Sequence, residues 1–280
     1  MRLLTNKKKF NSCLVTYTYK GSEKYLNRFK KTIHIQKYKN FDVLIFNDKC
    51  NLKNFQTDYP YRIINNSKSI FKNRVDSLKF LLKMKYKKIH FLDIDDSMSS
   101  DRILKLDKAL DKYNIVFCNI HVRNKKKILH TNYLNKFLKK KIFRYPDLIH
   151  QNFLGFSNTS VNLNNLRSEV KKIFLMKYSP YVSDWPIFFQ FAIKNNIYFV
   201  KNTFIEYYTR PRSITQLPLK LNQVNRKFIL DLKIKFYNQF KNMKLVNNEL
   251  KKLNLLKKKS SFKSLKLLSR YTGWWGAVIK

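Results

Sequence analysis

Short apolar runs alternate with helical periodicity through the first hundred residues. Four runs have the length and apolar content of buried strands: residues 13–18 (CLVTYT), 41–47 (FDVLIFN), 61–65 (YRIIN) and 88–92 (KIHFL). Residues 23–37 and 72–87 instead repeat large apolar side chains every three or four positions, which predicts helices. Strands that alternate with helices favour right-handed crossovers, so the pattern predicts an α/β fold with a mostly parallel twisted sheet flanked by helices.

The pattern continues less regularly to about residue 225. It predicts helices over 101–113 and 161–177, a strand over 115–122, and two short strands over 197–201 and 204–209. Another helix begins at Ser183-Asp184-Trp185-Pro186, where Ser or Asp serves as the N-cap and proline lies in the first turn. A basic stretch without clear periodicity occupies residues 123–143.

A different pattern begins near Arg226. Large apolar residues mark one face of a long helix whose other faces are mainly Lys and Asn: Ile229, Leu232, Phe236, Phe240, Met243, Leu250 and Leu253. A second amphipathic piece with Phe262, Leu265 and Leu268 follows, and then the pair Trp274-Trp275. We therefore divide the chain into an α/β domain, residues 1–225, and a basic amphipathic helical extension, residues 226–280.

Composition adds a strong electrostatic constraint. The 280 residues include 59 Lys and Arg against 17 Asp and Glu, a net charge of +42. Such a field favours anionic partners, whether phosphorylated ligands, acidic glycans, nucleic acid or anionic lipid. Hydrophobic residues make up 44% of the chain, which excludes a disordered protein.

Cysteine usage and the absence of long apolar runs indicate the compartment. Cys13, Cys50 and Cys118 form no C-x-x-C pair, so neither a disulfide framework nor a zinc knuckle is expected. The first apolar run is too short for a signal peptide, and no run approaches the 18 residues of a transmembrane helix. We expect a cytoplasmic protein.

The main candidate for chemistry is a cluster of three carboxylates, Asp93, Asp95 and Asp96, directly after an apolar strand. Carboxylates this close repel one another, and a cation such as Mg²⁺ or Mn²⁺ relieves the repulsion. An acidic turn that caps the helix at Asp101 is the plainer alternative. Parallel strands gather ligand-binding groups at their carboxyl ends, so Thr16, Tyr17 and Asp48 are predicted to join the cluster at one edge.

Residues 13–19 (CLVTYTY), 41–48 (FDVLIFND) and 91–98 (FLDIDDSM) resemble the opening of the family-2 glycosyltransferases of the GT-A fold. That family typically shows a strand ending in Thr-Tyr-Asn, a strand ending in an Asp pair and a Leu-Asp-x-Asp-Asp block. The resemblance covers about residues 10–215. It implies a nucleotide-sugar donor whose diphosphate carries Mn²⁺ or Mg²⁺, with Asp95 as the leading ligand and Asp93 and Asp96 in support.

Two motifs depart from the family. Thr18-Tyr19 lacks the following Asn, and only Asp48 stands where an Asp pair is usual. The Ala-Arg-Asn segment of the family looks like Lys72-Asn73-Arg74 here, so the resemblance makes Asp48 and Arg74 candidate contacts to the donor base. A turn aspartate and a solvated helix arginine are equally open alternatives.

The resemblance also implies roles near the end of the α/β domain. Asp184, at a helix start, stands where similar inverting enzymes place the general base that deprotonates the acceptor hydroxyl. A simple N-cap is the alternative. Arg210 and Arg212 follow a predicted strand and could face the leaving diphosphate, or they could belong to a solvated basic loop.

The resemblance implies transfer of a hexosyl or N-acetylhexosaminyl group to a glycan or lipid-linked glycan, in bacterial surface polysaccharide or lipopolysaccharide synthesis. The basic extension with its Trp pair predicts peripheral contact with an anionic membrane surface at the inner face of the cytoplasmic membrane, and a helix docked on the α/β domain is the alternative.

Two other functions stay open. A nucleic-acid-binding protein would explain the charge but not the clustered aspartates. A catalytically silent GT-A-like module that binds a membrane glycolipid would keep the metal and nucleotide sites without turnover.

Overall fold

A computed structural model describes residues 9–66, 68–124, 127–176, 183–209, 223–258 and 273–274. Within them, ten strands form one sheet, whose main path runs β3-β2-β1-β4-β10-β6-β11-β5. The strands of the main path are β1 Ser12–Tyr19, β2 Phe41–Asp48, β3 Tyr61–Asn65, β4 Lys88–Phe91, β5 Ser97–Met98, β6 Ile115–Arg123, β10 Thr159–Asn162 and β11 Ile197–Tyr208. Off this path, β7 Ile128–His130 pairs with β6, and β8 Ile142–Phe143 pairs with β11.

Strand directions place one set of ends together. The pairs β2–β3, β1–β2 and β1–β4 are parallel, and so is β6–β11. The short strand β10 is antiparallel to both β4 and β6, so β6 runs in the same direction as β4. The carboxyl ends of β1, β2, β4, β6 and β11 therefore share one edge, where β10 begins. The predicted α/β fold with a mostly parallel sheet is confirmed.

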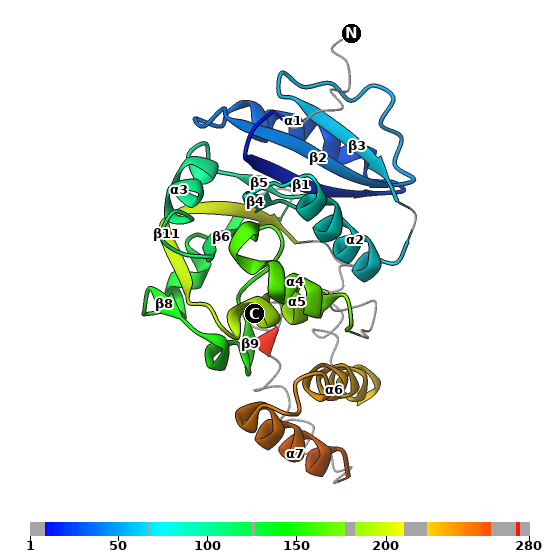
Figure 1. Cartoon of the computed structure of the whole chain (residues 1–280), viewed down its shortest axis with the longest axis vertical. Helices are drawn as coiled ribbons and strands as arrows, with labels where there is room; N and C mark the ends of the chain where they lie inside the picture. The colour runs from blue at the N-terminus through cyan, green and yellow to red at the C-terminus, as the bar shows by residue number, and fades with distance from the viewer. Residues whose placement is uncertain are drawn as a thin grey trace.

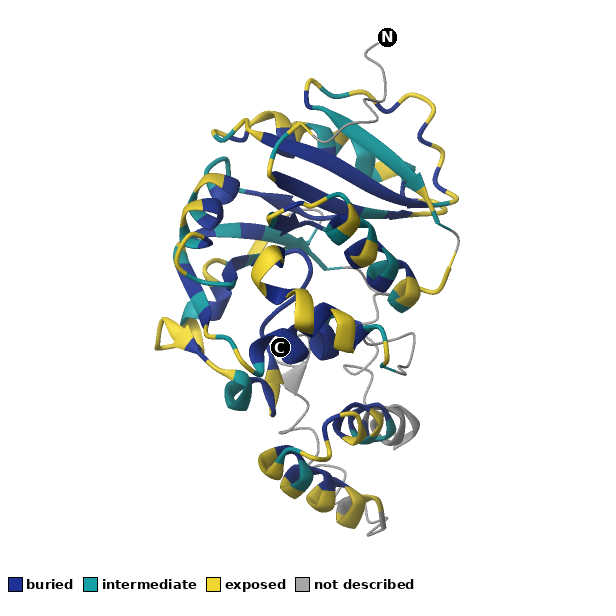
Figure 2. Ribbon diagram, viewed as in Figure 1, coloured by how far each residue is buried: buried dark blue, intermediate teal, exposed yellow. Residues whose placement is uncertain are grey.

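Helices cover both faces of this sheet (Figure 1). The α-helices are α1 Leu26–His34, α2 Ile70–Lys83, α3 Arg102–Ala109, α4 Arg167–Ile173, α5 Asp184–Ala192, α6 Gln223–Asn238 and α7 Lys244–Lys258. Right-handed crossovers in opposite directions put α1 and α2 on opposite faces, and α2 packs with α4 and α4 with α5. Figure 2 shows the buried central strands and the helices with exposed outer faces, as amphipathic helices require.

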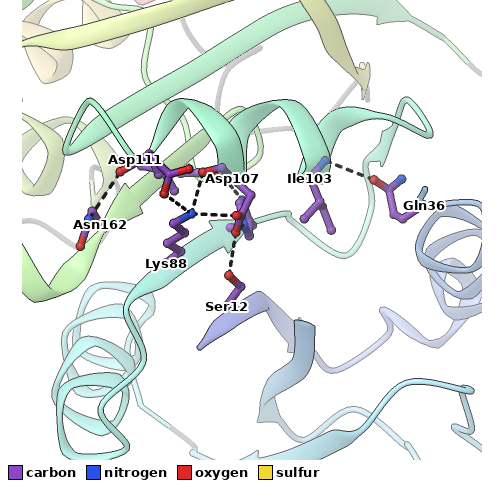
Figure 3. A network of polar contacts seen from close by, with 10 residues as sticks. Ser12, Gln36, Lys88, Ile103, Asp107, Asp111 and Asn162 are labelled. Atoms are coloured by element: carbon purple, nitrogen blue, oxygen red, sulfur yellow. Dashed lines mark hydrogen bonds and ion pairs between the residues drawn. The ribbon is translucent and has the colours of Figure 1, made fainter. Parts of the chain in front are cut away.

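A polar network holds α3 against the other edge of the sheet, where the parallel strands β1 and β4 begin (Figure 3). The Lys88 ammonium lies 2.8 Å from Asp107 Oδ2 and 2.7 Å from Asp111 Oδ1, while Ser12 Oγ donates to Asp107 Oδ1 at 2.6 Å. Hydrogen bonds from His90, Lys88 and Ser12 hold the pKa of Asp107 below its usual range against the effect of burial. These contacts lie away from the carboxyl edge and are structural.

Gln36, which follows α1, connects that helix to the start of α3. Its Oε1 accepts from the backbone N–H of Ile103 at 3.3 Å, and its Nε2 donates to the Thr32 and Ser99 carbonyls. The end of α1 and the start of α3 are thereby joined just after the loop that follows β4 (Figure 3).

Two of the predicted elements are wrong. The helix predicted over 161–177 begins only at Arg167, because Thr159–Asn162 is β10 and a 3₁₀ turn, Leu163–Leu166, follows it. A strand of four mostly polar residues carries little apolar signal, yet β10 is buried because it lies between β4 and β6. The two short strands predicted over 197–209 are one strand, β11, with an irregularity between Val200 and Phe204 where it pairs with β6.

The predicted long basic helix is a helical pair. α6 ends at Asn238 and α7 starts at Lys244. Phe236 packs against Trp185 and Phe189 of α5, with ring centroids 4.8 and 5.3 Å apart, and the Tyr237 hydroxyl donates to the Ile149 carbonyl. The first part of the extension is therefore docked on the α/β domain.

The extension also adds a strand. Gly273–Trp274 forms β12, which pairs in parallel with β9 Gln151–Asn152. Phe262, Leu265, Leu268 and Trp275 lie outside the described residues. Of the helices that the structure describes, none combines the length and apolar character that crossing a bilayer requires.

Candidate active site at the carboxyl edge of the sheet

The acidic segment forms a tight turn at the end of β4. Leu92 still donates to the Val15 carbonyl of β1, and Asp96 N–H donates back to the Asp93 carbonyl at 3.0 Å. The chain then enters β5, which pairs with β11. The turn thus places Asp93, Asp95 and Asp96 where the topology gathers strand ends, as the sequence predicts.

Ser157, directly before β10, binds two of these carboxylates. Its hydroxyl accepts from Asp93 N–H at 3.1 Å and faces both Asp93 Oδ2, at 3.2 Å, and Asp96 Oδ2. One hydroxyl proton can serve only one carboxylate at a time. Burial, reinforced by the negative charge of Asp93, raises the pKa of Asp96 to about 7. The turn therefore holds more negative charge than its buried surroundings favour, which suits a cation.

The three carboxylates do not converge on one point. No group of three His, Cys, Asp or Glu side chains within the described ranges could hold a metal ion. Both oxygens of Asp96 already accept hydrogen bonds, one from Ser157 and one from Tyr208 N–H at 3.3 Å. The donor set fits a hard cation that takes one or two carboxylates and completes its shell with diphosphate oxygens and water. It does not fit an ion ligated by all three residues.

Arg74 of α2 links the acidic turn to the start of α5. Its Nη2 donates to Asp93 Oδ1 at 3.4 Å and its Nη1 donates to Ser183 Oγ, 109 residues away in the sequence. The guanidinium carbon lies 4.0 Å from the centroid of the Phe156 ring, and only 15% of the side chain is exposed. Arg74 is therefore not the solvated helix arginine of the alternative interpretation.

Asp184 is the first residue of α5, and Ser183 occupies the N-cap position. Asp184 Oδ1 accepts from Trp185 N–H at 2.8 Å. Burial raises the pKa of Asp184, while the charge of Arg74 opposes the rise. Gly155 lies beside this carboxylate, since a Cβ at its position would be 4.0 Å from Asp184 Oδ2, an ordinary van der Waals contact. Arg74 thus lies between a carboxylate of the acidic turn and a second carboxylate whose basicity is raised.

The other residues that the sequence predicts to contact the donor differ in how far they are buried. Tyr17 is half-buried, and its hydroxyl lies 2.7 Å from Ser77 Oγ, so it lines the Arg74 side of the site. Asp48 is half-buried at the end of β2. Thr16 is fully buried within β1, so the structure gives it no surface for a donor. Arg210 and Arg212 lie outside the described residues.

Three contributors to this site were not anticipated: Ser157, Ser183 and Arg28. Arg28 of α1 donates to the Asp95 carbonyl, and its guanidinium carbon lies 3.7 Å from the centroid of the Tyr208 ring. Ser157 follows Gly155 in the segment NFLGFS, and this rare glycine was the only local signal. No spacing in the sequence could have paired Arg74 with Ser183.

The comparisons with known proteins bear on the fold alone. No family model matches the sequence, and no curated protein is similar to it in sequence. S. aureus TarS, residues 1–349, in complex with UDP-GlcNAc shares 12% identity at a TM-score of 0.59, covering 90% of this chain and 72% of TarS. The mannosyltransferase PcManGT from Pyrobaculum calidifontis, with GDP-Man and Mn²⁺, shares 11% identity at a TM-score of 0.57, covering 99% and 86%. These likenesses, together with the sheet order and the acidic turn after β4, show that the chain has the GT-A glycosyltransferase fold.

Proposed function

We propose that this protein is a metal-dependent glycosyltransferase that moves a sugar from a nucleoside-diphosphate donor to a hydroxyl of a glycan or lipid-linked glycan. The observation that carries the proposal is the Arg74 bridge, which joins Asp93 at the carboxyl edge to the helix start that bears Asp184. A structural ion pair alone would not require a second, partly buried carboxylate whose pKa is raised by burial.

The residues divide into two groups by role. Asp93 and Asp95 would hold Mn²⁺ or Mg²⁺, which when bound neutralises charge on the donor diphosphate. Asp184 removes the proton from the acceptor hydroxyl as that oxygen forms a bond to the anomeric carbon and the bond to the diphosphate oxygen breaks. Attack from the face opposite the leaving group inverts the anomeric carbon.

Arg74 acts on the proposed general base, Asp184, as well as on the donor site. Its positive charge opposes the rise in the pKa of Asp184 that burial causes, and it favours the ionised carboxylate that a general base requires. Arg210 and Arg212 would approach the leaving diphosphate from the segment after β11. We place the reaction in bacterial surface polysaccharide or lipopolysaccharide synthesis at the cytoplasmic face of the membrane, on the family resemblance and the charge of +42.

A thermal-stability screen of nucleotide sugars tests the proposal. UDP- and GDP-sugars head the panel because TarS and PcManGT were solved with UDP-GlcNAc and GDP-Man. A ligand at 100 times its dissociation constant adds about 2.7 kcal/mol, which raises the melting temperature by roughly 5 to 10 °C. The rise should require Mn²⁺ or Mg²⁺ and should vanish in Asp93→Asn. A complete panel without any metal-dependent rise would contradict the proposal.

A further inference from the structure

Residues 127–144, which include β7 and β8, are firmly attached to the domain. We call this stretch the β7–β8 segment. Four of its apolar side chains are buried in the core: Tyr133, Leu134, Leu138 and Phe143. Leu134 N–H also donates to Asn119 Oδ1 of β6 at 3.0 Å, and β8 pairs with β11. The segment therefore needs no further apolar residues to hold its place.

Four more large apolar side chains nevertheless point outward. Ile128 is 46% exposed, Leu129 36%, Phe137 48% and Ile142 43%. They account for four of the eleven exposed large apolar side chains in the described part of the chain, although the segment is short. Ring contacts of 5.6 Å between His130 and Tyr133 and of 5.0 Å between Tyr133 and Phe137 connect β7 with Phe137. Ile128, Leu129 and Phe137 therefore gather at the β7 end, beside the carboxyl end of β6, whereas Ile142 lies on β8, which pairs with the start of β11 at the opposite edge of the sheet. Exposed apolar side chains gathered at the β7 end mark an interaction surface rather than random surface composition.

The sequence around these residues is basic, since no Asp or Glu occurs from Arg123 to Pro146. Two carboxylates reach this region in space, and both form ion pairs, Asp147 with Lys140 and Glu206 with Arg123. At the β7 end, Lys127 directly precedes Ile128 and Lys136 directly precedes Phe137. Both lysines are exposed, so this surface complements a negatively charged partner that also accepts apolar side chains.

We propose that the β7 end of this segment, with Ile128, Leu129, Phe137, Lys127 and Lys136, is a peripheral membrane-binding surface that recognises anionic lipid. Lysine ammonium groups favour lipid phosphates, while Ile128, Leu129 and Phe137 enter the boundary between headgroups and acyl chains. Aliphatic side chains favour lipid over nucleic acid, because a nucleic-acid surface uses aromatic stacking and arginine forks against bases and phosphates. This contact is separate from the C-terminal extension.

The topology places this surface beside the candidate active site. β7 pairs with Val122 and Arg123 at the carboxyl end of β6, which is the edge that carries the acidic turn. A membrane bound at β7 would therefore lie near the edge where an acceptor enters. This consequence rests on the proposed function, whereas lipid binding itself does not.

Vesicle co-sedimentation of the full-length chain tests the proposal, with phosphatidylglycerol-containing and pure phosphatidylcholine vesicles at two salt concentrations. The wild type should bind the anionic vesicles, bind the neutral ones more weakly and dissociate partly at high salt. The lysine variant Lys127→Gln, Lys136→Gln should lose binding by at least tenfold, since each lysine near an anionic surface contributes roughly fivefold. The double variant Ile128→Ser, Phe137→Ser should also bind less than the wild type.

The matched control is Ile35→Ser, which removes an equally exposed apolar side chain, 53%, after α1 at a different end of the molecule (Figure 1). It should bind like the wild type. Wild-type binding by the lysine variant would assign the contact to the C-terminal extension and overturn the proposal. Equal binding to neutral and anionic vesicles would overturn it too. So would an absence of vesicle binding together with oligonucleotide binding that these variants abolish. Metal-dependent stabilisation by nucleotide should survive in every variant, which keeps this test apart from that of the glycosyltransferase.

Discussion

Replacing Arg74 by methionine removes the positive charge between Asp93 and Asp184 while keeping an unbranched apolar stem. The structure predicts a loss of stability that depends on pH. Arg74 donates to Asp93 and Ser183 and packs on Phe156, and hydrogen bonds that involve a charged group contribute about 1.5 to 3 kcal/mol each. Asp93 is 33% exposed, so solvent screening lowers the electrostatic part, and we expect a total loss of about 1 to 3 kcal/mol at pH 8.

The pH dependence follows from the carboxylates that remain. Burial raises the pKa of Asp184 in the folded state, so the folded protein binds more protons than the unfolded chain above a pH of about 4. This group therefore favours folding at low pH, and its contribution is lost as pH rises through the folded pKa. Without the Arg74 charge that pKa rises further, so the folded state of the variant is favoured more strongly by protonation of Asp184. The penalty of Arg74→Met should thus be smaller at pH 5 than at pH 8.

Urea unfolding of the wild type and Arg74→Met at both pH values measures this difference without any substrate. Arg74→Lys is the control, because it keeps the charge but lacks the planar fork that reaches both partners. It should lose stability with little change between pH 5 and pH 8. An Arg74→Met penalty that is equal at the two pH values would refute the electrostatic role of Arg74.

Three further changes test neighbouring parts of the argument. Asp95→Asn should weaken metal-dependent nucleotide binding more than tenfold in a thermal-shift titration, and full binding in excess chelator would contradict this. Asp184→Asn should lower turnover by about 10² to 10⁴ with unchanged donor affinity, whereas a loss of about 1 kcal/mol of stability at full rate would leave Asp184 with only a structural role in the first turn of α5. Burial lowers the pKa of Lys233, whose ammonium lies 5.5 Å from the centroid of the Trp185 ring, to about 8. The unfolded chain therefore binds more protons between pH 8 and about 10.5, and wild-type stability rises with pH in that window. Lys233→Met should accordingly stabilise the protein at pH 7 by about 1 to 3 kcal/mol and by much less above pH 10.5, as measured by urea unfolding.

The first four strands show how far a local pattern reaches. The apolar runs at 13–18, 41–47, 61–65 and 88–92 became β1 to β4 with boundaries moved by at most one residue. β1, β2 and β4 are almost entirely buried, and a strand buried on both faces is mainly apolar, so its sequence reports its burial directly. β3 is half-buried at the end of the sheet, yet it keeps enough apolar residues to be recognised. β10 gave no such signal, because its neighbours in the sheet bury its polar residues, as when Ser160 Oγ lies 2.9 Å from His90 Nδ1.

In the candidate site, too, the sequence determines some features and only the tertiary structure determines the others. The sequence by itself determined that Asp93, Asp95 and Asp96 follow a buried strand, and parallel topology then required them to lie at the carboxyl edge. Only the tertiary structure decided which partners each carboxylate has. Ser157 reaches Asp93 and Asp96 because β10 is antiparallel and begins at that edge, and Arg74 reaches Ser183 because α2 and α5 share one face of the sheet. Periodicity reports whether a residue is buried, but contacts between distant segments depend on how the elements pack, and those contacts set the charge and basicity of this site.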